Sequence, residues 1–173
     1  MPDTLRKNAV TMKGSPLSLV GEELKVGDTA PDFKLMATDL SEKTLSDYAG
    51  KVKIIATVPS LDTSVCDAET RQFNERAASL SDDIVVLTVS LDLPFAAKRW
   101  CGAHGIENVE CLSDYKNRDF AKAYGVLIDD LLVAARAVFV LDKSNQVVYT
   151  QLVPEIAEEP DYEAALEAAK AAV

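Results

Sequence analysis

The sequence predicts an α/β fold in which helices flank a central mixed β-sheet. Three apolar runs, at residues 52–58, 84–90 and 137–141, are almost uninterrupted, which is typical of central strands that are covered on both faces. Segments with helical spacing lie between and after these runs, as expected for crossover connections. The chain of 173 residues is long enough for one proper core, and we predict a single domain over residues 1–173.

The N-terminal third is predicted to contain short elements. Residues 9–20 alternate weakly around a turn at residues 14–16, which indicates a small β-hairpin. A turn-rich loop follows at 27–32, then a short strand at 33–37 and one helical turn at 46–50, which ends at a glycine.

The remaining elements make up the core. The first apolar run is followed by a helix, and the last run turns into an antiparallel partner strand and then a C-terminal helix that Asp161 is placed to cap. The predicted helices are 67–80, about 94–103, 117–124 and 161–172, and the predicted partner strand is 146–152.

The composition narrows the classes of partner and compartment. A formal net charge of −10 argues against binding to nucleic acid or to an anionic membrane, because both need a basic surface. No apolar run has the length of a membrane span, and the N-terminus lacks the apolar stretch of a signal peptide, so we expect a cytoplasmic protein. The odd number of cysteines, three, favours reactive or buried thiols over a disulfide framework.

Cys66 stands out because it ends the turn that joins the strand 52–58 to the next helix. Unpaired N–H groups and the positive end of the helix dipole favour a thiolate there, and the thiolate is the nucleophilic form of cysteine. Cys66 shares an apolar helical face with Thr70 and Phe73 and therefore points at the sheet. It is either a small packing residue or a nucleophile in the floor of a pocket at the end of the strand.

Two neighbours of Cys66 have either a structural or a chemical role. Thr63 is placed to cap the helix, with its hydroxyl beside the N–H of Cys66, and the same hydroxyl could reach both the sulfur and a substrate oxygen. Pro59 ends the strand, and it could also shield a thiolate from water.

Arg136 is the only charged residue between Asp130 and residue 141. If it is buried it needs an anion as partner, which a Cys66 thiolate would supply; alternatively it lies at a strand end and extends to water.

Several other chemistries find little support. No Cys-x-x-Cys pair or glycine-rich phosphate loop is present. A cysteine–histidine dyad would need His104, the only histidine, which we place at a helix end and which is equally consistent with a surface residue. A zinc site built from Cys66, Cys101, His104 and Cys111 would match no paired ligand spacing, so we expect no metal.

Residues 59–66 read Pro-Ser-Leu-Asp-Thr-Ser-Val-Cys and resemble the Pro-x-x-x-Thr/Ser-x-x-Cys motif of the peroxiredoxins. The chain is most similar to their bacterial thiol peroxidase branch, the atypical two-cysteine peroxiredoxins, and the similarity runs from about residue 8 onward. Further stretches that resemble this branch are residues 14–16, 91–96, 99–103, 134–138 and 159–162.

This resemblance implies a thioredoxin-like fold and the reduction of hydrogen peroxide and organic hydroperoxides without metal or organic cofactor. Cys66 would be the peroxidatic cysteine, oxidised to a sulfenic acid. Thr63 would position the peroxide, Pro59 would shield the sulfur, and Arg136 would stabilise the thiolate and the developing oxygen charge.

The resemblance also implies that Cys101 resolves the sulfenic acid by forming an intrachain disulfide with Cys66. Both segments would have to unfold locally in each cycle, and Gly102 and Gly105 ease this next to Cys101. Cys111 is interpreted as a buried bystander in a short strand at 109–112. Thioredoxin is the implied reductant and a homodimer the implied assembly, in a role in antioxidant defence; a peroxide sensor and a non-enzymatic binding module with inert cysteines are the alternatives.

Overall fold

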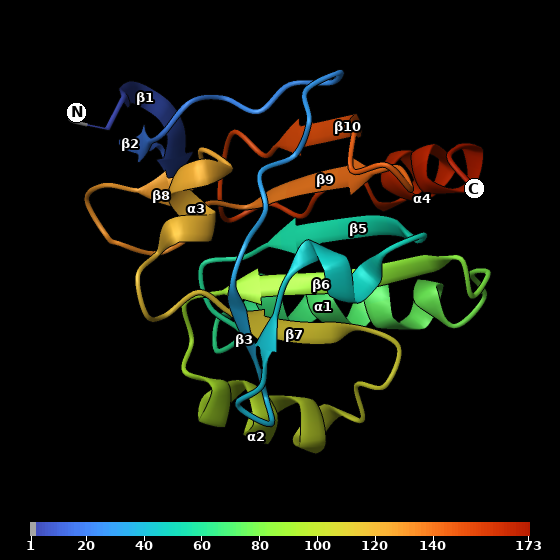
Figure 1. The fold of residues 1–173 in the computed structure, drawn as a ribbon. Helices are drawn as coiled ribbons and strands as arrows, with labels where there is room; N and C mark the ends of the chain where they lie inside the picture. Colours follow the sequence, from blue (N-terminus) through green and yellow to red (C-terminus); the bar gives the residue numbers. More distant parts are fainter. Residues whose placement is uncertain (1–2) are drawn as a thin grey trace.

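The computed structural model describes residues 3–173 and contains a seven-stranded mixed sheet in the order β10-β9-β5-β6-β7-β3-β4 (Figure 1). β5 runs parallel to β6, and β6 parallel to β7, whereas β9, β10, β3 and β4 join by antiparallel pairing. The predicted mixed sheet is therefore confirmed. Its strands are β3 (Leu35–Ala37), β4 (Glu42–Lys43), β5 (Val52–Thr57), β6 (Ile84–Ser90), β7 (Glu110–Ser113), β9 (Ala137–Leu141) and β10 (Val147–Leu152).

Helices cover this sheet on both faces. Consecutive residues of a strand point to opposite faces, so Ile54 packs with α1 and α4 in one apolar cluster while Ile55 packs with α3 in another. This double cover explains why all six residues of β5 are buried. The helices are η1 (Leu45–Tyr48), α1 (Ser64–Ala77), α2 (Pro94–His104), α3 (Asp119–Ala123) and α4 (Tyr162–Ala171).

The predicted N-terminal hairpin is confirmed as β1 (Leu5–Met12) and β2 (Ser15–Val20), which form a separate three-stranded sheet with β8 (Leu127–Ile128). Its turn is not at residues 14–16 as predicted but at Lys13 and Gly14, which have φ of 49° and 82°. A two-residue type I′ hairpin turn has positive φ at both central positions, and a proline cannot adopt a positive φ. Pro16 accordingly lies inside β2 rather than in the turn.

Other element boundaries shift by a few residues. α1 begins at Ser64 rather than residue 67, because Thr63 has the extended backbone of an N-cap (φ −94°, ψ 148°). The turn predicted at 46–50 is a 3₁₀ helix, η1, that starts at Leu45. Asp161 caps α4 as predicted, and its carboxylate accepts a hydrogen bond from the N–H of Ala164.

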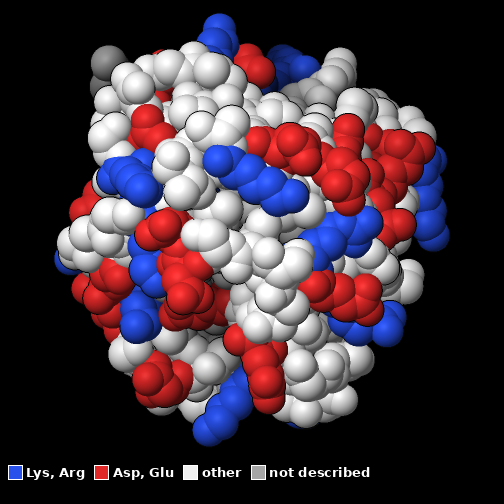
Figure 2. Space-filling view, turned by 90° about the vertical axis from the view of Figure 1, so that its right-hand side faces the viewer, with Lys and Arg blue, Asp and Glu red and all other residues white. Residues whose placement is uncertain are grey.

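The surface charge is distributed in groups. On the face shown in Figure 2, acidic side chains form several clusters with lysine and arginine side chains between them. Among the residues that the structure describes, no helix has the length and apolar character needed to cross a lipid bilayer.

Candidate active site

The loop between β5 and α1 is held in place by Asp92, which follows β6. The Asp92 carboxylate accepts hydrogen bonds from the Ser60 hydroxyl at 2.7 Å and from the Leu61 N–H at 2.8 Å. Pro59, half-buried, begins this loop just beyond the end of β5. Since β5 and β6 are parallel neighbours, Asp92 fixes the loop over the carboxyl end of the sheet. No pattern in the sequence singles out Asp92 for this role.

Thr63 is the N-cap of α1, but its hydroxyl does not cap the helix as predicted. The first helical bond runs from the N–H of Asp67 to the carbonyl of Thr63 at 2.9 Å, so the N–H of Cys66 lies in the open first turn. The Thr63 hydroxyl instead donates to the carbonyl of Ser60 at 3.0 Å. The compact loop brings that carbonyl within reach, and the exposed Thr63 oxygen keeps lone pairs free to accept a hydrogen bond.

The structure brings Cys66 and Arg136 together although 70 residues separate them. Both are buried, with 0% and 1% of their surfaces exposed, and Nη2 of Arg136 donates to Sγ of Cys66 at 3.2 Å. Nε of Arg136 donates to the carbonyl of Ile156 at 2.9 Å, which fixes the plane of the guanidinium. Burial opposes the charge on Arg136, but Glu69 and Cys66 outweigh it and raise the pKa of the guanidinium.

Glu69 completes this buried group. It lies one turn after Cys66 on α1, is fully buried, and forms an ion pair through Oε2 with Nη1 of Arg136. Burial raises the pKa of Glu69 to about 7 even though Arg136 favours its ionised form. Oε1 of Glu69 has no hydrogen-bond partner within residues 3–173. The guanidinium of Arg136 thus contacts the Glu69 carboxylate through Nη1 and the Cys66 sulfur through Nη2.

Replacing Glu69 by glutamine should flatten the pH dependence of stability. The carboxyl titrates near its ordinary value of 4.5 when the chain is unfolded and near 7 when folded, so its contribution is complete below about pH 4.5 and is lost as the pH rises through 7. In the wild type this lowers the unfolding free energy over that range by up to about 3 kcal/mol, and Glu69→Gln removes that loss.

Urea unfolding at a series of pH values measures this effect. Glu75→Gln, at an exposed position of the same helix, is the matched control and should keep the wild-type profile. Asp114, whose pKa burial raises to about 6, leaves a residual slope of the same sign in both variants. An unchanged slope in Glu69→Gln would contradict the assignment.

The second predicted site cysteine, Cys101, lies in α2 next to a contact that ties α2 to α1. Nε1 of Trp100 donates to Oδ1 of Asp67 at 2.9 Å, and Nε2 of His104 lies 3.2 Å from the same oxygen. The rings of Trp100 and His104 stack with centroids 4.6 Å apart. We call Asp67, Trp100 and His104 the α1–α2 contact. His104 ends α2 as predicted, and its ring nitrogens pair with Asp67 and the Trp100 carbonyl rather than with a thiol.

Cys111 lies in β7, close to the short strand predicted for it, and is buried as expected. The structure also shows what the sequence did not indicate: the sulfurs of Cys101 and Cys111 are 3.0 Å apart. The hydrogen bond between them lowers the pKa of Cys101 and raises the pKa of the more buried Cys111, so Cys101 is the thiol that ionises first.

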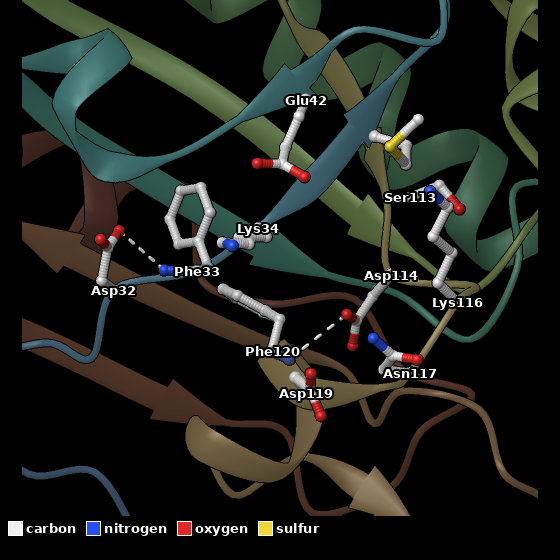
Figure 3. A pocket seen from close by; sticks show the side chains of 11 residues that line it. Asp32, Phe33, Lys34, Glu42, Ser113, Asp114, Lys116, Asn117, Asp119 and Phe120 are labelled. Atoms are coloured by element: carbon white, nitrogen blue, oxygen red, sulfur yellow. Dashed lines mark hydrogen bonds between the residues drawn. The ribbon is translucent and has the colours of Figure 1, made fainter.

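The hollow drawn in Figure 3 lies at other residues. That hollow has a volume of about 470 Å³ and is lined by acidic side chains with two lysines and the rings of Phe33 and Phe120; none of its lining residues is a predicted site residue. Among residues 3–173, no group of three or more histidine, cysteine, aspartate or glutamate side chains is arranged to hold a metal ion.

Comparison with known proteins gives consistent matches over almost the whole chain. The Redoxin family matches residues 25–166. A thiol peroxidase of Halalkalibacterium halodurans is 55% identical over 95% of this chain and 99% of the relative, and one of Bacillus subtilis is 55% identical over 95% and 98%. The crystal structure of a peroxiredoxin-like protein from Aquifex aeolicus superimposes with a TM-score of 0.90 at 45% identity, covering 100% of both chains.

Proposed function

Because the chain belongs to the Redoxin family, we propose that Cys66 is the sulfur at which it reduces hydroperoxides. The observation that carries this proposal is the buried contact between Arg136 Nη2 and Cys66 Sγ at 3.2 Å. A fixed cation beside a sulfur stabilises its thiolate, and the thiolate is the reactive form.

The activity itself follows from the relatives. The chain is a peroxiredoxin-type peroxidase, an oxidoreductase that reduces hydroperoxides with electrons from thiols, as its identity to thiol peroxidases over nearly their full lengths indicates. The resemblance predicted from residues 59–66 is confirmed, and with it the thioredoxin-like fold.

In the proposed first step, the Cys66 thiolate attacks the terminal oxygen of the peroxide. The O–O bond breaks, the leaving oxygen is protonated to water or an alcohol, and Cys66 becomes a sulfenic acid. Arg136 stabilises the thiolate and the charge that develops on the oxygens. Thr63, an exposed residue, accepts a hydrogen bond from the peroxide O–H and positions the substrate, while Pro59 excludes water from the sulfur.

In the second step, the Cys101 thiolate attacks the sulfur of the Cys66 sulfenic acid and a disulfide forms. The S–O bond breaks, and the departing hydroxide takes up a proton from solvent to leave as water. Cys66 is fully buried, so the first turn of α1 and the α1–α2 contact must open before the sulfurs can meet. The lowered pKa of Cys101 provides the attacking thiolate. Thioredoxin then reduces the disulfide.

Disulfide mapping tests these two steps, and Cys111→Ser is the suitable background because it removes the thiol beside Cys101. One equivalent of hydrogen peroxide should convert this variant to a single species with a Cys66–Cys101 link, identified by peptide mass spectrometry. The double variant Cys101→Ser, Cys111→Ser is the control and should instead hold a trappable sulfenic acid at Cys66. Absence of an intrachain link in Cys111→Ser would remove Cys101 from the resolving role.

The proposal also covers the domain organisation, the cellular compartment and the oligomeric state. Residues 1–173 form a single domain that acts in the cytoplasm in antioxidant defence. Two copies associate, and Leu93 and Phe95, 52% and 66% exposed at the start of α2, offer apolar side chains for the contact between them. Sedimentation equilibrium of the full chain should give a dimer mass, and a monomer at micromolar concentration would contradict it.

A further inference from the structure

The contact between Cys101 and Cys111 places a third sulfur beside the proposed resolving cysteine. Their sulfurs are 3.0 Å apart in the folded protein, whereas a disulfide bond measures about 2.05 Å, so a shift of about one ångström would allow a bond. Cys101 comes from α2 and Cys111 from β7. The folded chain therefore presents this pair of sulfurs ready to be linked.

The pair Cys66–Cys101 is different. Sγ of Cys66 lies buried against Arg136, and the α1–α2 contact holds the adjacent turns of both helices. A disulfide between these two cysteines therefore keeps part of α1 and α2 out of their packed positions. Moving Cys101 from Cys66 to Cys111 would let α1 return to the packed state.

We propose that Cys111 is a third redox-active cysteine, which takes over Cys101 from the disulfide with Cys66 by thiol–disulfide exchange. The inference rests on the proposed function, since that disulfide is its starting point. It assigns a catalytic role to a residue that the sequence indicated to be a bystander.

The exchange balances without a further oxidant or reductant. The Cys111 thiol loses its proton to solvent, and its thiolate attacks Sγ of Cys101. The Cys101–Cys111 bond forms as the Cys66–Cys101 bond breaks, and the electron pair of the broken bond leaves on Cys66 as a thiolate. One disulfide is present before and after, so the oxidising equivalents that came from the peroxide are conserved.

Two features of the structure favour this direction. Arg136 stabilises the departing Cys66 thiolate once α1 refolds around it, and a stabilised leaving thiolate speeds exchange. The new disulfide also allows the packed α1–α2 contact, which a Cys66–Cys101 disulfide keeps open, to form again.

The environment of Cys111 changes in favour of ionisation at that moment. The largest cause of its raised pKa is the hydrogen bond with Cys101, which is removed while Cys101 is held in a disulfide, although burial and the nearby carboxylates of Glu110 and Asp92 still raise the pKa. Thr88 is the register partner of Cys111 on the adjacent strand β6, and its buried hydroxyl has no hydrogen-bond partner within residues 3–173. Neighbouring strands are about 4.8 Å apart, so this hydroxyl can donate to a thiolate at Cys111.

The exchange returns Cys66 to the reactive thiolate and leaves the oxidising equivalents in the Cys101–Cys111 disulfide. Cys101 and Cys111 both line a surface hollow of about 580 Å³, where a reductant can approach the new disulfide. The protein can then consume a second peroxide before it meets its reductant.

The test is to identify the thiol that remains after one equivalent of hydrogen peroxide. The fully reduced wild type is treated, quenched in acid, alkylated under denaturing conditions and mapped by mass spectrometry. We expect Cys66 to be alkylated and Cys101 to be linked to Cys111. In rapid mixing, the wild type should consume two equivalents of peroxide in the fast phase, whereas Cys111→Ser and Cys111→Ala should consume one.

Two outcomes would contradict the exchange, and they differ in what they mean for the proposed function. An alkylated Cys111 with a Cys66–Cys101 link in the wild type would overturn the exchange and leave the proposed function standing. Retention of all three thiols would overturn the exchange and the proposed function together. The wild-type mapping needs no substitution, so it decides even if a variant folds poorly.

Discussion

Replacing Cys66 by serine should abolish peroxide reduction, with the second-order rate constant falling on the order of 10⁴-fold or more, as for the loss of other catalytic nucleophiles. A hydroxyl does not ionise under conditions in which the thiol does, so no nucleophile remains at the buried contact with Arg136. Peroxide consumption by the reduced protein, without any recycling system, measures this effect directly.

Cys101→Ser is the matched control for this result. It lacks the proposed resolving thiol but keeps Cys66, so the first equivalent of peroxide should react at nearly the wild-type rate while continued turnover with thioredoxin stops. Full activity of Cys66→Ser would overturn the assignment of the nucleophile, and a slow first equivalent in Cys101→Ser would show that Cys101 contributes to peroxide attack.

Replacing Arg136 is expected to have the second largest effect. Arg136→Met removes the cation that touches Cys66 Sγ, and loss of one such stabilising donor typically slows catalysis about 10²–10³-fold. Arg136→Lys keeps a charge but cannot donate to the sulfur, the Glu69 carboxylate and the Ile156 carbonyl together in the planar arrangement of the guanidinium. It should therefore recover only part of the rate.

Stability separates this chemical effect from simple misfolding. Arg136→Met leaves the buried Glu69 without its cation, so at a pH high enough to keep the carboxyl ionised the unfolding free energy should fall by about 3–5 kcal/mol. The double variant Arg136→Met, Glu69→Gln removes both charges and should regain stability without regaining the rate of peroxide attack. Recovery of the rate in the double variant would contradict a direct role for Arg136.

Sequence periodicity was sufficient for most of the fold. The runs at 84–90 and 137–141 correspond to β6 and β9 to the residue, because strands buried on both faces are mostly apolar. The hairpin turn was misplaced by one residue, since a positive φ at Lys13 leaves little trace in the sequence. Boundaries that depend on backbone conformation were accordingly less predictable than the strands.

A contact within the site could be predicted only where a residue, once buried, requires a partner of opposite charge. A lone arginine among apolar residues implied an anion, and the structure places Arg136 against Cys66. Glu69 was missed because a glutamate on a helix is usually solvated, although its position three residues after Cys66 put it on the same side of α1. The approach of Cys111 to Cys101 depends on how α2 packs on β7, which no local pattern records.

A quenched single turnover shows which cysteine reacts first with peroxide, and we expect this to be Cys66. Reduced wild-type protein is mixed with less than one equivalent of hydrogen peroxide in the presence of a sulfenic acid trap, quenched at successive times and mapped for each cysteine. Trapped sulfenic acid should appear first and only at Cys66, before any disulfide accumulates. Sulfenic acid appearing first at Cys101 or Cys111, with Cys66 still a free thiol, would contradict this expectation.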